Sequence, residues 1–189
     1  MKSSEFRSIL KKLGKNNIAI MGHMGSGKSV VGRMFANKFG FQHIDSDQKI
    51  IQLTNKSINN IFEEKGEKFF RNIEKKVVLN LIEKKNIVLS LGGGSILNIS
   101  IRNKLKKKSF TLFLDVDFKE LEKRLKRSHK RPLLKNMDIN EKIKELDTER
   151  RKYYLLADII IQNTTPIDTF KKFARAFSNF NEKTNSYKN

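Results

Sequence analysis

The residues best suited to chemistry form a phosphate-binding sequence near the N-terminus. Residues 22–29 read Gly-His-Met-Gly-Ser-Gly-Lys-Ser, which completes the pattern G-x-x-x-x-G-K-[S/T]. Glycines let successive backbone N–H groups turn toward phosphate oxygens, and the helix that should follow adds a favourable dipole at its N-terminus. We expect Lys28 to place its charge on the β- and γ-phosphates and the Ser29 hydroxyl to ligate Mg²⁺. A glycine-rich turn between strand and helix, without a ligand, is the competing interpretation. The predicted nucleotide contacts are Gly25, Ser26, Gly27, Lys28, Ser29 and Val30.

Two further groups of chemical interest follow apolar segments later in the chain. Asp45-Ser46-Asp47 closes the second apolar segment, and Gly92-Gly93-Gly94-Ser95 closes the third. Ligands bind at the carboxyl ends of the strands in open α/β sheets, so both groups should face the same crevice as the phosphate loop. We expect one carboxylate to serve the metal and the other to point toward a hydroxyl. Asp47 could instead cap a helix that begins near Gln48, and a tight turn alone could need the three glycines.

The elements that must position these groups alternate between strand and helix. Short apolar runs rich in β-branched residues predict strands at Ile18–Met21, His43–Asp45, Ile87–Leu91, Thr111–Leu114 and Asp158–Ile161. Longer segments between them carry apolar residues three and four positions apart and predict two helical faces: Val30, Val31, Met34, Phe35 and Phe39, ended by Gly40, and Ile73, Val77, Val78, Leu81 and Ile82. Strands separated by helices indicate β-α-β units. We therefore expect a three-layer α/β/α fold with a five-stranded parallel sheet.

A single domain should account for most of the 189 residues. We predict that it spans residues 17–177, with a polar N-terminal extension at 1–16 and a polar C-terminal tail at 178–189, and that both ends fray. No apolar run approaches the roughly 18–20 residues of a membrane span. The N-terminus lacks the apolar core of a secretory signal, and the chain contains no cysteine. We therefore expect a cytoplasmic monomer without membrane association.

The charge balance is strongly basic. The chain has 40 Lys and Arg residues against 20 Asp and Glu residues, a net charge of +20. Such a balance suits either an anionic substrate or a nucleic-acid surface. It can also reflect a general bias in composition, with most lysines on solvated helix faces. Composition alone leaves these three interpretations open.

The phosphate loop is the first of several sequences that occur in the order of a known family. It is followed by Asp45-Ser46-Asp47, Gly66-Glu67-Lys68-Phe69-Phe70-Arg71-Asn72-Ile73-Glu74, Gly92-Gly93-Gly94, Arg131-Pro132-Leu133-Leu134, and Glu149-Arg150 with Tyr154 and Ala157-Asp158. In these sequences the chain resembles the shikimate kinases over residues 17–162. The resemblance implies a P-loop kinase fold with a substrate-binding segment near residues 46–74 and a mobile lid near 127–137. It also implies transfer of the γ-phosphate of ATP to the 3-hydroxyl of shikimate, a step of chorismate and aromatic amino acid biosynthesis.

The resemblance also implies roles on the acceptor side of the cleft. Asp47, Arg71, Gly93 and Arg150 match the shikimate-binding positions, with Asp47 as the candidate base or orienting group for the attacking oxygen. Arg71 and Arg150 would bind the carboxylate in the planar bidentate geometry that suits arginine. Glu74 follows Arg71 by one helical turn and could hold that guanidinium in place.

The nucleotide side is assigned by the same resemblance. Asp45 would serve Mg²⁺ together with Ser29, and Arg124 matches the position that stacks on adenine. Arg131 would reach from the lid to the transferring phosphoryl group, where charge is spread in the transition state. The predicted catalytic residues are Lys28, Asp47 and Arg131, and the predicted cofactors are ATP and Mg²⁺.

Two positions depart from the expected pattern. Many relatives carry proline two residues after the position of Arg150, where this chain has Arg151-Lys152. The spacing to Tyr154 is kept, so we assign the role to Arg150 and not to Arg151. His23 occupies an unconstrained position in the phosphate loop, and we interpret it as a solvated bystander.

Two other classes of function are weighed against a shikimate kinase. The first is another small-metabolite kinase of similar fold, of the gluconate kinase type. Arg71, Gly93 and Arg150 disfavour it, because this set suits a carboxylate on a compact ring. The second is a basic nucleic-acid-binding module, which is disfavoured because no helix-turn-helix, zinc or aromatic RNA-reading motif is found. We expect shikimate and ATP as partners and no specific nucleic acid.

Overall fold

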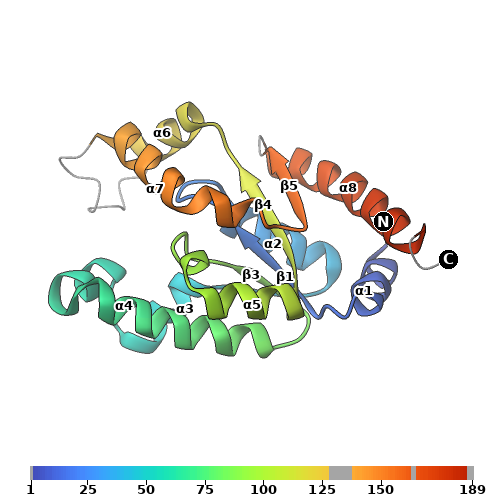
Figure 1. Ribbon diagram of the computed structural model, residues 1–189, viewed down its shortest axis with the longest axis horizontal. Coiled ribbons are helices and arrows are strands. Elements are labelled where there is room, and N and C mark those ends of the chain that lie inside the picture. The colour runs from blue at the N-terminus through green and yellow to red at the C-terminus, as the bar shows by residue number, and fades with distance from the viewer. Residues whose placement is uncertain (1, 128–137, 163–164, 187–189) are drawn as a thin grey trace.

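The computed structural model describes residues 2–127, 138–162 and 165–186, with side chains described as far as residue 180 (Figure 1). Five parallel strands form its central sheet in the order β2-β3-β1-β4-β5. The strands span Asn17–Met21 (β1), Gln42–Asp45 (β2), Ile87–Ser90 (β3), Ser109–Asp115 (β4) and Ile159–Gln162 (β5). Each strand predicted from the sequence is confirmed to within two residues at either end. In the register of the sheet, Ile18 lies opposite both Val88 and Phe110.

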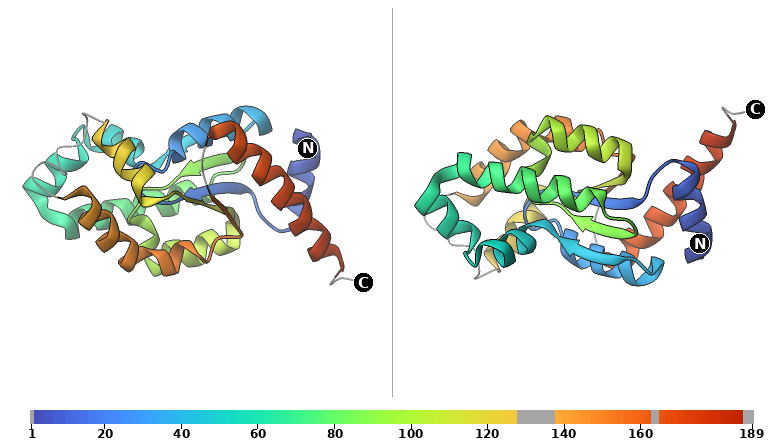
Figure 2. Two further views of the ribbon diagram at one scale, coloured as in Figure 1. Left: turned by 90° about the horizontal axis from the view of Figure 1, so that it is seen from above. Right: turned by 90° about the horizontal axis from the view of Figure 1, so that it is seen from below.

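Helices cover both faces of this sheet. They are α1 (Ser3–Lys12), α2 (Lys28–Phe39), α3 (Ser46–Thr54), α4 (Ile58–Glu83), α5 (Ile99–Lys108), α6 (Phe118–Lys126), α7 (Ile139–Tyr154) and α8 (Pro166–Ser186), with a 3₁₀ turn, η1, at Ser95–Leu97. Ile18 and Ile20 of β1 pack with α1, α2 and α8, whereas Ala19 and Met21 pack with α4, α5 and the end of α7. Figure 2 shows the sheet between α2 on one side and α5 with α7 on the other. The predicted three-layer α/β/α fold is confirmed.

Burial on both faces explains why the central strands β1 and β3 are mostly apolar. All five residues of β1 are buried, and β3 is buried throughout. A strand covered on both faces needs apolar side chains at every position, not at alternate ones. Two strands end in a carboxylate, Asp45 in β2 and Asp115 in β4.

Helix α2 is set by glycines at both of its ends. Gly27 caps its N-terminus with φ 91°, and Gly40 ends it with φ 65°. Both angles lie in the left-handed region that glycine adopts without strain. The prediction that Val30 belongs to the buried face of this helix is wrong, because Val30 is 48% exposed whereas Val31 is buried. Consecutive residues of an α-helix point about 100° apart, and Val30 turns toward the cleft.

Helix α4 bends at Gly66, which has φ 76° and ψ 170°. Residues on both sides of the bend pack with α3 in a small apolar cluster that contains Ile50, Ile61 and Phe70. The part after the bend carries the residues that pack on the sheet, such as Val78. The predicted substrate-binding segment near residues 46–74 is therefore a sub-structure with a core of its own beside the main sheet.

The prediction that residues 1–16 form a frayed extension is wrong for the residues that the structure describes. Helix α1 buries Phe6 completely, and this ring stacks on Phe39 at 3.9 Å between centroids and lies 4.8 Å from Phe177. Ile9 and Leu10 are buried on the same face of the helix. Three apolar residues spaced three and four apart were enough to fix this helix, although its other positions are polar.

The predicted C-terminal tail also begins inside a helix. Helix α8 continues past Phe177 to Ser186, and Phe180 packs against the same apolar cluster as Phe6. Figure 2 shows α1 and α8 together at the end of the molecule where both termini lie. No helix among the described residues is both long enough and apolar enough to cross a membrane.

Candidate active site

The phosphate loop connects β1 to α2 and folds around the side chain of Lys28. The Lys28 ammonium donates hydrogen bonds to the backbone carbonyls of Gly22 and His23, at 2.9 and 2.8 Å. Gly22, Gly25 and Gly27 all have positive φ. This conformation turns backbone N–H groups toward the start of α2, where a helix dipole favours an anion.

Ser29 and Asp45 meet beside this loop. The Ser29 hydroxyl donates to Asp45 Oδ2 at 2.5 Å, and Asp45 Oδ1 accepts the backbone N–H groups of Asp47 and Gln48 at 3.0 and 3.2 Å. Asp45 is therefore the N-cap of α3. The alternative in which Asp47 caps this helix is wrong, and its carboxylate lies in the cleft instead. A hydroxyl oxygen and a carboxylate oxygen side by side suit a hard cation such as Mg²⁺.

A cleft of about 1130 Å³ extends from the phosphate loop to the start of α4. The predicted site residues that line it are Gly25, Gly27, Lys28, Ser29, Val30, Asp45, Asp47, Arg71, Gly93, Arg124 and Arg150. Ser26 does not line the cleft: it is fully buried, and its backbone N–H donates to the carbonyl of His23 at 3.1 Å. Arg131 and most of the predicted lid lie outside the described residues.

Three consecutive glycines follow β3, and two of them make room for a charged side chain. A β-carbon at Gly92 would collide with Asp47 Oδ1, and one at Gly94 would collide with the guanidinium of Arg71. At Gly93 a β-carbon would lie 3.5 Å from Arg150 Nη1. None of these three glycines has positive φ. Gly92 and Gly94 therefore leave room for the close approach of Asp47 and Arg71, whereas the distance at Gly93 is an ordinary van der Waals contact.

Arg71 is held in place by two carboxylates on its own helix. Its Nη1 donates to Glu74 at 2.7 Å, and its Nε and Nη2 donate to Glu67 at 3.1 and 3.0 Å. Glu74 is 3% exposed and also accepts a hydrogen bond from Ser95, at 2.7 Å. Burial opposes the charge of Arg71, but Glu74 and Glu67 outweigh it and raise the pKa of the guanidinium above its ordinary value. The predicted contact between Glu74 and Arg71 is confirmed.

Arg150 and Arg151 point to different places. Arg150 lines the cleft, with its side chain 11% exposed and its Nε 3.1 Å from Glu149. Arg151 lies outside the cleft lining and pairs with Asp115 at 3.0 Å and with Asp147 at 3.3 Å. Arg150 is thus the one of the two that can reach a ligand in the cleft.

Tyr154 joins this region to the glycine loop. Its hydroxyl donates to the backbone carbonyl of Gly93 at 2.7 Å, and its ring stacks on Phe113 with 4.9 Å between centroids. Burial raises the pKa of its phenol well above the ordinary value, so the group remains a neutral donor. The end of α7 is therefore fixed to the loop that contacts Arg150.

The interpretation of His23 as a solvated bystander is wrong. The residue is 4% exposed, and its Nε2 lies 2.8 Å from Asp147 Oδ1. Its ring also meets the ring of Tyr154 edge to face at 5.0 Å. The side chain turns away from the ligand side of the loop and packs against α7.

Known proteins resemble this chain both in sequence and in structure. A sequence model of the family described as "Shikimate kinase" matches residues 24–178. The chain belongs to the shikimate kinase family. A shikimate kinase of Persephonella marina is 41% identical over 145 residues, which cover 77% of this chain and 87% of that relative.

Solved structures also resemble the fold of this chain. A shikimate kinase from Acinetobacter baumannii, in complex with shikimate, superposes with a TM-score of 0.83 at 31% identity and covers 94% of this chain and 98% of that one. A gluconokinase from Sinorhizobium meliloti has a TM-score of 0.57 at 18% identity, covering 92% of this chain and 98% of that one. The second likeness shows the fold alone.

Within this shikimate kinase framework, Arg124 lies at the end of the cleft formed by the phosphate loop. Its Nε donates to Glu120 at 2.8 Å, and its Nη1 lies 3.5 Å from the carbonyl oxygen of Ser26. The guanidinium is therefore held next to the phosphate loop by a carboxylate one turn earlier on α6. Its stacking on adenine remains a prediction.

Sequence reasoning missed several residues that support the predicted ones. Glu67 could have been found from its spacing of four residues before Arg71 on a helix. Ser95 could not, because it meets Glu74 only once β3 and α4 have packed. Asp147 gave no signal, since its partner His23 is 124 positions away.

Proposed function

We propose that this protein transfers the γ-phosphoryl group of ATP to the 3-hydroxyl of shikimate, giving ADP and shikimate 3-phosphate in aromatic amino acid biosynthesis. Membership of the shikimate kinase family supports the reaction. The observation that carries the assignment of the site is the convergence of Asp47, Arg71 and Arg150 on the three glycines at 92–94, in the same cleft as the phosphate loop.

The acceptor is recognised by its charge and by its hydroxyls. Arg71 and Arg150 bind the carboxylate, because a guanidinium presents paired N–H donors that match the two carboxylate oxygens. Glu74 and Glu67 fix the plane of the Arg71 guanidinium, so that little rotamer entropy is lost when the ligand binds. Asp47 accepts hydrogen bonds from the ring hydroxyls.

Nucleotide and metal occupy the other half of the cleft. The backbone N–H groups of the phosphate loop and the ammonium of Lys28 bind the phosphates, and Ser29 with Asp45 holds Mg²⁺. Among the described residues no cluster of three or more His, Cys, Asp and Glu could form a metal site. Mg²⁺ commonly takes one or two protein ligands and completes its shell with phosphate and water. When bound, Mg²⁺ neutralises charge on the transferring phosphate.

Transfer itself demands positioning more than covalent chemistry. Asp47 orients the attacking oxygen and takes up its proton, and Lys28 stabilises charge on the equatorial oxygens. Arg131, from the predicted lid, adds a second cation at the transferring group. The protein is proposed to act as a monomer.

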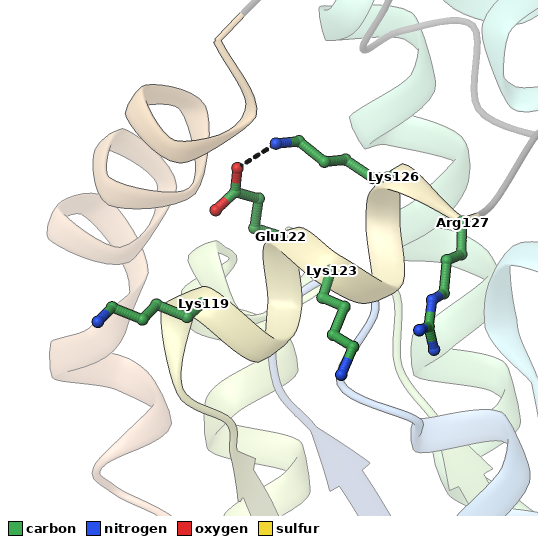
Figure 3. A pocket seen from close by; sticks show the side chains of 5 residues that line it. All are labelled: Lys119, Glu122, Lys123, Lys126 and Arg127. Atoms are coloured by element: carbon green, nitrogen blue, oxygen red, sulfur yellow. Dashed lines mark ion pairs between the residues drawn. The ribbon is translucent and has the colours of Figure 1, made fainter.

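The basic surface does not favour nucleic acid as the ligand. A shallow hollow of about 320 Å³ on α6 is lined by Lys119, Glu122, Lys123, Lys126 and Arg127. Figure 3 shows Lys119 and Arg127 pointing away from each other at opposite ends of the helix, and Lys126 paired with Glu122 at 2.5 Å. The lining has no aromatic ring on which a base could stack.

The test is ADP release by purified protein with ATP, Mg²⁺ and a panel of hydroxy-acids, shikimate, quinate and gluconate among them. Among these acceptors we expect turnover with shikimate only. Lys28→Met should abolish this turnover, because Lys28 supplies charge at the phosphates. Lys119→Ala removes an exposed lysine outside the cleft and should keep wild-type activity. Turnover with gluconate and none with shikimate would overturn the proposal, as would near-normal turnover of folded Lys28→Met.

A further inference from the structure

His23 is a buried polar side chain in the phosphate loop. The groups of this loop that suit phosphate binding are its backbone N–H groups and the ammonium of Lys28. Its ring is held from two sides: Nε2 meets Asp147 Oδ1 at 2.8 Å, and the edge-to-face contact with Tyr154 fixes the ring plane. The side chains of His23 and Asp147 are only 5% and 13% exposed. Meanwhile the backbone carbonyl of His23 accepts from Lys28. One residue thus contacts the phosphate-binding lysine through its backbone and α7 through its ring.

Asp147 lies on α7 one turn before the arginine that faces the acceptor. It also accepts from Arg151 Nη1 at 3.3 Å, and Arg151 in turn donates to both oxygens of Asp115 at the end of β4, at 3.3 and 3.0 Å. His23, Asp147, Arg151 and Asp115 therefore form a chain of polar contacts that ties α7 to the phosphate loop and to the sheet. Arg150 leaves the same turn of α7 in another direction and reaches the cleft.

The protonation of His23 follows from its surroundings. Burial lowers its pKa, the contact with Asp147 raises it, and the charges of Lys28 and Arg150 lower it further, with a net shift below the ordinary value. The ring is neutral near pH 7. Because a carboxylate can only accept, the proton of the neutral ring lies on Nε2 and is donated to Asp147.

We propose that His23 and Asp147 are positioning residues, which dock α7 on the phosphate loop and so present Arg150 to the carboxylate of the acceptor. This inference rests on the proposed function of the cleft. It makes the geometry of acceptor binding depend on the phosphate loop, although neither His23 nor Asp147 lines the cleft.

A packing role alone would predict something different. An apolar pair in place of both partners commonly stabilises a fold as well as a buried polar pair does. His23→Leu alone leaves the Asp147 carboxylate with Arg151 and should cost stability, so stability by itself does not separate the two roles. A hydrogen bond, in contrast, has a direction and fixes the rotation of α7 about its axis. Loss of that direction should appear in acceptor binding and not in nucleotide binding.

The experiment compares His23→Leu, His23→Gln and His23→Asn in steady-state kinetics with shikimate and ATP. Gln places an N–H donor near the position of Nε2, whereas Asn is too short and Leu has no donor. We expect Leu and Asn to raise the KM for shikimate by about three-fold to ten-fold, the range of one hydrogen bond. The affinity for ATP in a direct binding assay should stay within about two-fold in every variant, and His23→Gln should restore the wild-type KM. Lys144→Ala, an exposed change on the same helix, is the control.

A second readout uses pH. Because the folded protein keeps His23 neutral, the unfolded chain takes up a proton first as the pH falls. The contribution of His23 to the free energy of unfolding is therefore complete above its ordinary pKa of 6.5 and is lost progressively below it. His23→Gln cannot titrate, so its stability relative to wild type should rise between pH 7.5 and 5.5. His43 titrates equally in both proteins and cancels in this difference.

The outcomes separate this inference from the proposed function. Wild-type turnover of shikimate tests the function by itself, whatever the variants do. If wild type is active and both Leu and Asn keep its KM for shikimate, the positioning role is overturned. It is equally overturned if Gln is as impaired as Leu, or if ATP affinity falls in parallel with shikimate affinity. Should His23→Leu fail to fold, the comparison of Gln with Asn decides in the same way.

Discussion

At the scale of single residues, the charged groups of the cleft are held by partners of their own. Arg71 is fixed by Glu67 and Glu74, and Glu74 is fixed in turn by Ser95. A buried charge without partners would be costly, and a flexible one would lose entropy on binding. The sub-structure around α4 therefore holds the Arg71 cation rigidly at the cleft.

This arrangement predicts that different residues of the cleft bind the acceptor and the nucleotide. Arg71→Ala and Asp47→Asn should each raise the KM for shikimate or lower its turnover by ten-fold or more, because losing one partner of a desolvated charge pair typically costs about 2–5 kcal/mol. The affinity for ATP, measured by calorimetry, should change little, since both side chains lie on the acceptor side. Arg33→Ala removes an exposed arginine of α2 and serves as the control. Loss of ATP binding with shikimate binding unchanged would contradict this division.

How far single residues could be predicted from the sequence depends on the range of their contacts. The pair of Arg71 and Glu74 is three positions apart on a helix and was predictable. The role of Gly92 and Gly94 as space for Asp47 and Arg71 was not, because the two side chains arrive from α3 and α4. The burial of His23 was missed for the same reason: only tertiary packing places Asp147 beside it.

At the scale of elements, the strands were predicted well and the terminal helices poorly. Strands buried on both faces are uninterrupted apolar runs, such as Ile87–Ser90, and such runs stand out in a polar chain. Helix α1 has only Phe6, Ile9 and Leu10 as buried residues among ten positions. So few apolar residues give a weak signal, and their importance becomes visible only against the phenylalanines of α2 and α8.

Helix α1 should therefore contribute strongly to stability. Phe6→Ala should lower the free energy of unfolding by about 3–5 kcal/mol, the usual cost of removing a buried phenylalanine, as measured by urea denaturation. Phe6 does not line the cleft, so activity well below the melting temperature should persist. Phe69→Ala is the matched control, because that ring is 45% exposed and its loss should cost far less. Equal stability of the two variants would show that α1 is not part of the fold in solution.

At the scale of the whole molecule, the net charge of +20 has to be reconciled with a cleft that uses only a few cations. Several of the described cations form ion pairs with carboxylates: Lys56 pairs with Glu64, Lys104 with Glu83, and Lys126 with Glu122. Others diverge over helix surfaces, as the side chains of α6 do in Figure 3. A dispersed positive field attracts anions from a distance without specifying which anion is bound.

A salt series distinguishes incidental charge from a nucleic-acid footprint. A polyelectrolyte binder releases counterions, so its affinity falls by roughly a thousand-fold or more between 50 and 200 mM salt when six or more phosphates are contacted. The kinase cleft makes a few buried contacts, and mobile ions screen these much less. We therefore expect weak, non-specific DNA and RNA binding that disappears near physiological salt, while phosphorylation of shikimate continues with at most a modest rise in KM from lost steering. Fluorescence anisotropy and ADP release should be measured across one series of salt concentrations. Selective, sub-micromolar nucleic-acid binding at about 150 mM salt, without shikimate-dependent ADP release, would contradict the kinase function. It would show that the protein acts by binding nucleic acid on its basic surface.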